Sequence, residues 1–131
     1  MSIETAIRGR LLAYPGVASL VGTRIFPQLM PQGTTLPAIT YAVVSRTTEP
    51  TMGYSNTGMW STLLQIDVWA DSYSGVKVLA DQVRAALMDW YQESTEPIWR
   101  VLHRNEEESY ESDTLTFRVS LDFEVLSAVG S

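Results

Sequence analysis

The chain has 131 residues, of which 45% are hydrophobic and 18% charged, and it contains no cysteine. This length and composition predict one globular domain spanning residues 1–131, and they exclude a disulfide framework, a catalytic thiol and a zinc site built on sulfur. The formal net charge of −6 disfavours tight nucleic-acid binding, because the field of the protein repels phosphate. No stretch has the length and apolarity of a membrane span and no signal-peptide layout is present, so we expect a soluble, cytoplasmically made protein without membrane contact.

The N-terminal segment predicts a helix from Ser2 to Tyr14, with Ser2 as its N-cap. Its apolar residues fall at helical spacing: Ile3, Ala6, Ile7, Leu11 and Tyr14. Pro15-Gly16 should end this helix, because proline disfavours helical geometry at the residue before it. A short helical turn through Val17, Leu20 and Val21 follows. We expect Arg24–Pro27 to be a short extended piece and the turn-rich chain as far as Pro37 to be irregular.

The middle of the sequence predicts two strands separated by a long loop. The alternation of Ile39, Tyr41 and Val43 with their neighbours predicts a strand over Ala38–Ser45, and a second alternating stretch predicts a strand over Trp60–Ala70. Between them, Arg46–Met59 is rich in Gly, Ser, Thr and Asn, which is typical of a loop. Long loops within compact domains are usually functional or disordered, so this one is a candidate for partner contact.

The C-terminal half predicts one helix and two further strands. Ser74 can cap a helix whose apolar residues run from Val76 to Trp90 at steps of three and four. Ile98–Arg104 reads as extended, the acidic Asn105–Asp113 as a hairpin loop, and Leu115–Val125 as a strand with one core face. The expected fold is α+β: an antiparallel four-stranded sheet with two main helices packed on one face and a long loop between the first two core strands.

Catalytic, cofactor and metal sites find no support in the sequence. His103 is the one imidazole and has no nucleophile motif beside it. The acidic stretch lacks the ligand spacing and central glycine of a calcium loop, which favours a solvated hairpin tip over a metal site. Gly53 and Gly58 have P-loop spacing, but Met59-Trp60 stands where Lys and Ser or Thr are needed. We therefore predict no catalytic, cofactor-binding or metal-binding residue.

The residues best placed to contact a partner lie in the two predicted loops. Met52, Tyr54, Met59 and the adjoining Trp60 offer large apolar side chains in or beside the long loop. Glu106, Glu107 and Glu108 offer charge at the expected hairpin tip. We name these seven residues as candidate partner contacts.

Three stretches, taken together in order and spacing, resemble the tail-terminator family of long-tailed phages, also described as tail-completion or head-to-tail joining proteins. They are Arg24–Pro27 with Leu36–Tyr41, Gln65–Ala70 leading through Tyr73 into the helix, and Tyr110 followed by Phe117–Phe123. The opening helix and Gly22-Thr23-Arg24 also fit, so the resemblance covers nearly the whole chain. None of these stretches is a catalytic signature.

The resemblance implies a structural virion protein without enzymatic activity that forms a homo-hexameric ring on the head-proximal end of the tail tube. Such a ring halts tube polymerisation, contacts the tail tube protein and the head's connector or completion protein, and lets DNA pass through its lumen without specific binding. Two alternatives remain: a head-to-tail adaptor ring or generic protein-binding module of similar fold, and a small hydrolase that uses His103 with a nearby Ser or Glu. A terminator should form rings or cap purified tail tubes, whereas an adaptor should bind the portal side. Replacement of His103 by Ala tests the hydrolase alternative, which full retention of function would exclude.

Overall fold

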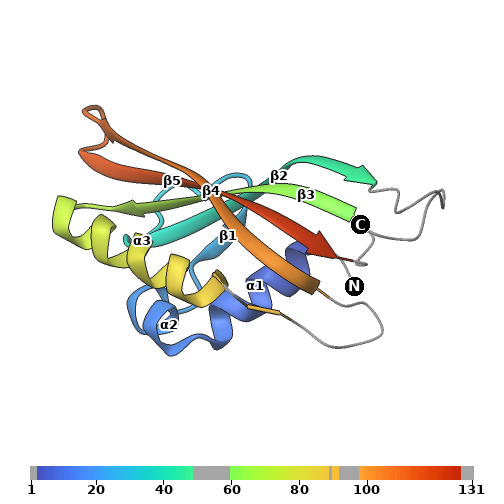
Figure 1. The fold of residues 1–131 in the computed structure, drawn as a ribbon. Coiled ribbons are helices and arrows are strands. Elements are labelled where there is room, and N and C mark those ends of the chain that lie inside the picture. Colours follow the sequence, from blue (N-terminus) through green and yellow to red (C-terminus); the bar gives the residue numbers. More distant parts are fainter. Residues whose placement is uncertain (1–2, 49–59, 89, 92–97, 128–131) are drawn as a thin grey trace, which may run out of the picture.

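The computed structural model describes residues 3–48, 60–88, 90–91 and 98–127. These residues form two layers, a five-stranded sheet and three helices that cover one of its faces (Figure 1). Along the chain the elements are α1 (Ile3–Ala13), α2 (Pro15–Val21), β1 (Ile25–Pro27), β2 (Ala38–Thr48), β3 (Trp60–Ala70), α3 (Tyr73–Leu87), β4 (Ile98–Glu111) and β5 (Thr116–Ser127). None of the helices in the described ranges is long and apolar enough to span a membrane.

The sheet has the strand order β1-β2-β3-β5-β4, with β1 parallel to β2 and the other pairs antiparallel. The predicted α+β class is confirmed, and the additional strand is β1, where Ile25 is aligned with Ile39. A three-residue strand is too short to show an alternating pattern, so the sequence indicated only an extended piece there.

The core lies between the sheet and the helices, and the predicted faces of β3 and β5 are confirmed. Leu64, Ile66 and Val68 on β3 are fully buried and face the same layer as Val119, Leu121 and Phe123 on β5. From the helices, Ile3, Ile7 and Leu11 of α1 and Leu79, Val83 and Leu87 of α3 complete this layer. Burial of these side chains is the main stabilising contribution to the fold.

The helix ends differ from the prediction in detail. Ser72, not Ser74, caps α3, because its Oγ accepts a hydrogen bond from the Gly75 N–H at 3.1 Å. Pro15 ends α1 as predicted, but it is also the first residue of α2. Proline is tolerated there because the N–H groups of a first helical turn have no acceptor within the helix. Trp90 lies beyond the end of α3 and still packs against the core.

Two predicted loops are partly strand. β2 continues through Thr48, so residues 46–48 pair with β3, and β4 continues through Glu111, so most of the expected acidic hairpin loop pairs with β5. The tight turn that remains places Leu115 at a φ of 53° with 66% of its side chain exposed. The prediction of an acidic hairpin loop over Asn105–Asp113 was therefore wrong, as was the placement of Leu115 at the start of a strand with one core face.

Candidate docking surfaces

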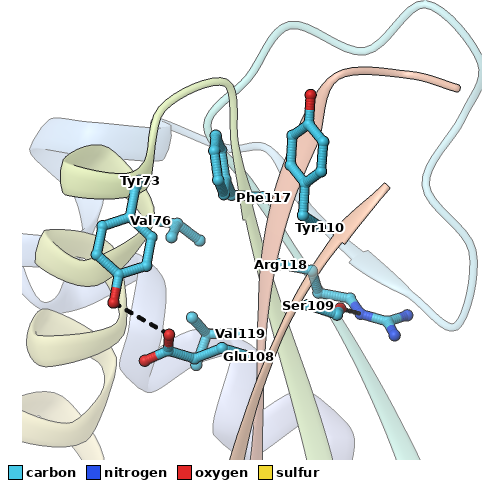
Figure 2. Close-up of a pocket in the computed structure, with 8 residues that line it drawn as sticks. All are labelled: Tyr73, Val76, Glu108, Ser109, Tyr110, Phe117, Arg118 and Val119. Carbon is cyan, nitrogen blue, oxygen red and sulfur yellow. Dashed lines mark hydrogen bonds between the residues drawn. The ribbon is translucent and has the colours of Figure 1, made fainter. Parts of the chain in front are cut away.

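An aromatic cleft of about 230 Å³ opens between the first turn of α3 and the end of the β4–β5 hairpin (Figure 2). Its walls come from three elements, with Tyr73 on α3, Tyr110 on β4 and Phe117 on β5. The Phe117 ring centroid lies 5.9 Å from that of Tyr73 and 4.6 Å from that of Tyr110. Both tyrosines are about half exposed. Such a cleft suits an apolar or aromatic side chain of a protein partner, because aromatic residues are enriched in the cores of interfaces.

Ion pairs connect α3 and β4 beside this cleft, and one of their carboxylates, Glu108, lines it. Glu108 accepts hydrogen bonds from Lys77 Nζ and from the Tyr73 hydroxyl, the latter at 3.1 Å. The hydrogen bond from Lys77, with that from Tyr73, lowers the pKa of Glu108 below its ordinary value, and the same bond raises the pKa of Lys77. About two helical turns further along α3, Arg84 donates to Glu106 and to Asp81. These contacts fix the edge strand against the helix layer.

The opposite face of the sheet carries no described helix (Figure 1). Its centre is a polar network in which Gln65 Nε2 donates to Asp67 at 3.1 Å and to Ser120 Oγ at 3.2 Å, while Ser120 donates to Asp67. Toward one end, Trp69 Nε1 donates to Thr40 Oγ1 at 3.1 Å. Because these polar groups are satisfied within the sheet, the face is preorganised and presents a fixed polar surface.

A groove of about 440 Å³ lies at the end of this uncovered face that is nearest the β4–β5 turn. The Arg118 guanidinium stacks over the Trp69 ring at 5.3 Å, and Arg118 Nε donates to Ser109 Oγ at 3.1 Å. Leu29 borders the groove with 82% of its side chain exposed. An arginine stacked on tryptophan beside an exposed leucine has the composition of a protein-binding surface.

The predicted loop contacts divide between described and undescribed residues. Trp60 begins β3, half-buried, and the Arg46 guanidinium lies 4.3 Å from its ring centroid while Arg46 Nε donates to Thr62 Oγ1. Met52, Tyr54 and Met59 lie outside the described residues. Their contact with a partner stays a prediction.

The three predicted glutamates lie in β4 and not on a hairpin tip. Glu106 and Glu108 turn toward α3, where Arg84 and Lys77 bind them. Glu107 has the opposite orientation, is exposed, and is aligned with Ser120 on the uncovered face. Their expected role as partner contacts stays a prediction, in which Glu107 is the carboxylate turned toward the uncovered face.

The comparison with protein families decides the identity. The family model for tail completion protein gp17 matches residues 5–128. The chain belongs to this tail completion family. The fold is also similar to a chain in a solved structure entitled "Virion of native gene transfer agent (GTA) particle", with a TM-score of 0.73 and 18% identity over 96% of this chain and 94% of that chain. No curated protein matches the sequence. The predicted resemblance is confirmed, and the family places the protein in the virion tail as a structural component.

His103 is the one imidazole of the chain and lies on β4 with its side chain partly buried. Its ring packs on Phe123 at a centroid distance of 5.2 Å, and its buried Nε2 forms no hydrogen bond within the described part of the chain. Glu106 Oε1 lies 3.7 Å from Nε2 but is already bound by Arg84. In the described ranges, no group of three or more His, Asp or Glu side chains is placed to hold a metal ion.

Sequence reasoning missed the residues that form the two candidate docking surfaces. Tyr73, Tyr110 and Phe117 all stood in the stretches that carried the family resemblance, yet nothing in one sequence showed that they meet in space. Trp69 had a clearer signal, because alternation along its strand placed it on the face away from the core. A large aromatic residue on an uncovered face is an indication of contact with a partner.

Proposed function

We propose that the protein forms a ring of six copies at the head-proximal end of the phage tail tube, stops tube polymerisation there and joins the tail to the head. The observation that carries this proposal is membership of the tail completion family over residues 5–128. The fold adds physical support, since one sheet face and an aromatic cleft are left uncovered for contacts with other chains.

A cyclic ring needs two different patches on each subunit, because one patch on a subunit meets another patch on the next. The aromatic cleft and the Trp69–Arg118 groove provide chemically distinct surfaces, which open toward the helix layer and the uncovered face and share Arg118 in their linings. The net charge of −6 supports passage of DNA through the lumen, because an acidic wall repels the phosphate backbone. The partners of the ring are then the tail tube protein on one side and the head-completion or connector protein on the other.

Tube polymerisation in vitro tests termination directly. The purified tail tube protein is polymerised alone and with increasing amounts of this protein, and tube lengths are measured by electron microscopy. We expect shorter tubes with rings at one end. Unchanged lengths, together with binding to isolated portal rings, would favour the adaptor alternative instead.

The segment between β2 and β3 is proposed to reach the tube or a neighbouring ring, with Trp60 and Arg46 forming a rigid base for it. The test replaces residues 50–57 with a short Gly-Ser linker and measures tail length and head attachment. We expect loss of attachment with the fold retained. A matched control substitutes Asp113→Ser and Asp71→Ser, two exposed acidic positions at the opposite end of the sheet from Thr48 and Trp60, and should leave attachment intact. Full attachment by the linker variant would contradict the proposed contact.

A further inference from the structure

The two edges of the sheet differ in whether another strand can join them. At β1, the Ile25 carbonyl accepts a hydrogen bond from Arg8 Nε at 3.2 Å, and Pro27 has no N–H to donate. The Pro27 carbonyl is also occupied, since it accepts from the Leu29 N–H at 2.6 Å. Proline and occupied backbone groups are the usual means of blocking an edge strand. The β1 edge is therefore closed to sheet extension.

The β4 edge is open. β4 runs over 14 residues and pairs with β5 on one side, and across the described ranges no hydrogen bond reaches its other side. The ion pairs Arg84–Glu106 and Lys77–Glu108 hold the strand against α3. An exposed edge of this length is a template for pairing with a strand of another chain.

The charges along β4 are sorted by sign. Arg100 and Arg104 lie in its first half, Glu107 and Glu111 lie in its second half, and all four are exposed. Two of them are already in contact within the chain, Arg104 with Glu124 and Glu111 with Arg118, the latter at 3.9 Å. For Arg100 and Glu107, the described part of the chain provides no ion-pair partner.

This sorting favours one mode of self-pairing over the others. Two antiparallel copies of β4 place the first half of each strand opposite the second half of the other, so the two arginines of each copy face the two glutamates of the other, in four contacts per dimer. Parallel, in-register stacking would instead align like charges, which is destabilising. A strand with one sign of charge throughout would repel a second copy in every register. This strand repels a second copy in the parallel, in-register arrangement and attracts it in the antiparallel one.

We propose that β4 of one copy pairs with β4 of a second copy, antiparallel about a two-fold axis near Asn105, which joins two five-stranded sheets edge to edge. The contact is isologous and closes after two copies, whereas a ring contact joins different patches. The pairing therefore stands apart from the proposed ring and does not rest on it.

Cysteine cross-linking tests the geometry, because the natural chain has no cysteine and an introduced thiol can form a disulfide only between copies. Asn105→Cys lies near the predicted axis, while the control Asp113→Cys lies in the hairpin turn, roughly 25 Å further along the strand direction. Under diamide we expect a covalent dimer of Asn105→Cys to form at least about tenfold faster than one of Asp113→Cys. Equal rates would overturn the proposal.

Charge exchange tests the complementarity in the natural backbone. We expect Glu107→Arg/Glu111→Arg and Arg100→Glu/Arg104→Glu each to weaken the dimer about tenfold in sedimentation velocity at low salt, from four cross-strand contacts per dimer. An equimolar mixture of the two variants should regain the wild-type affinity as a heterodimer. The control Asp71→Arg reverses an exposed charge between β3 and α3, outside β4, and should dimerise like the wild type.

A mixture no tighter than either variant alone would overturn the proposal, as would a wild type that stays monomeric at every concentration. The outcome separates this inference from the ring. Rings on tail tubes without Asn105→Cys cross-linking would refute the β4 pairing and leave the ring proposal standing. Cross-linking without rings would refute the ring and leave the pairing standing.

Discussion

The ion pair between Arg84 and Glu106 is the contact that most sharply tests the placement of β4 against α3. About three-quarters of each side chain is buried, since both are 24% exposed. An exposed pair contributes about 0.2–1 kcal/mol and a hydrogen bond to a charged group about 1.5–3 kcal/mol, so a partly buried pair should couple by about 1 kcal/mol. Arg84→Met, which keeps the aliphatic stem but also loses the contact with Asp81, should lower the free energy of unfolding by about 1–2 kcal/mol.

A double-mutant cycle in urea measures this coupling from the wild type, Arg84→Met, Glu106→Gln and the double variant. The matched control pairs Arg84→Met with Glu107→Gln, whose carboxylate lies one residue along the strand on the other face. We expect coupling of about 1 kcal/mol with Glu106, reduced at high salt, and near zero with Glu107. Equal coupling with both glutamates would mean that this stretch is a solvated loop, and the account of β4 would be wrong.

Three further predictions concern the core, the uncovered face and acid stability. Phe123→Ala should lower the free energy of unfolding by about 3–5 kcal/mol, because the ring is fully buried, and Phe123→Leu should cost less in the same urea titration. Trp69→Phe removes the donor to the nearly buried Thr40 hydroxyl and should cost about 1 kcal/mol, with a larger effect on assembly than on folding in a tail-attachment assay. The hydrogen bond from Lys77 is the main cause that lowers the pKa of Glu108, and the hydrogen bonds from Ser61 and Arg104 lower the pKa of Glu124. Because both carboxylates have a lower pKa in the folded than in the unfolded chain, they stabilise the fold above pH 4.5. This stabilisation is lost as the pH falls through the lowered pKa values. The melting temperature, measured against pH, should decrease as the pH falls below 4.5. The decrease should be less steep in Glu124→Gln, which has no carboxylate at this position to protonate.

Regular alternation made β3 and β5 predictable from the sequence. Leu64, Ile66 and Val68 are buried on one side as their spacing indicated, and Leu121 and Phe123 follow the same rule. The α3 helix was also predicted from the sequence, because its apolar residues recur at intervals of three and four. These elements bury one face only, which is the condition under which period alone identifies strand or helix.

The acidic strand escaped prediction because its stability depends on residues distant in the sequence. Glu106 and Glu108 looked unsuited to packed structure until Arg84 and Lys77 on α3 were seen to bind them. Local composition indicates a loop for such a run, and tertiary contacts override it. β1 was not predicted as a strand for a different reason: its three residues are too few to show an alternating pattern.

The docking surfaces were only partly accessible to sequence reasoning. The aromatic cleft combines side chains from α3, β4 and β5, and no single segment signals that Tyr73 and Tyr110 lie on either side of Phe117. The family could be inferred because its stretches keep their order along the chain, whereas the surfaces depend on which strands become neighbours. Strand order β1-β2-β3-β5-β4 is a property of the folded sheet and not of any one motif.

The central claim, that this tail completion protein acts by closing the end of a tube, is tested most directly by negative-stain imaging of purified tail tubes mixed with the protein. The account predicts six-fold rings on one end of the tubes and none along their sides. Tubes with bare ends at saturating protein, with the protein monomeric in the background, would contradict it.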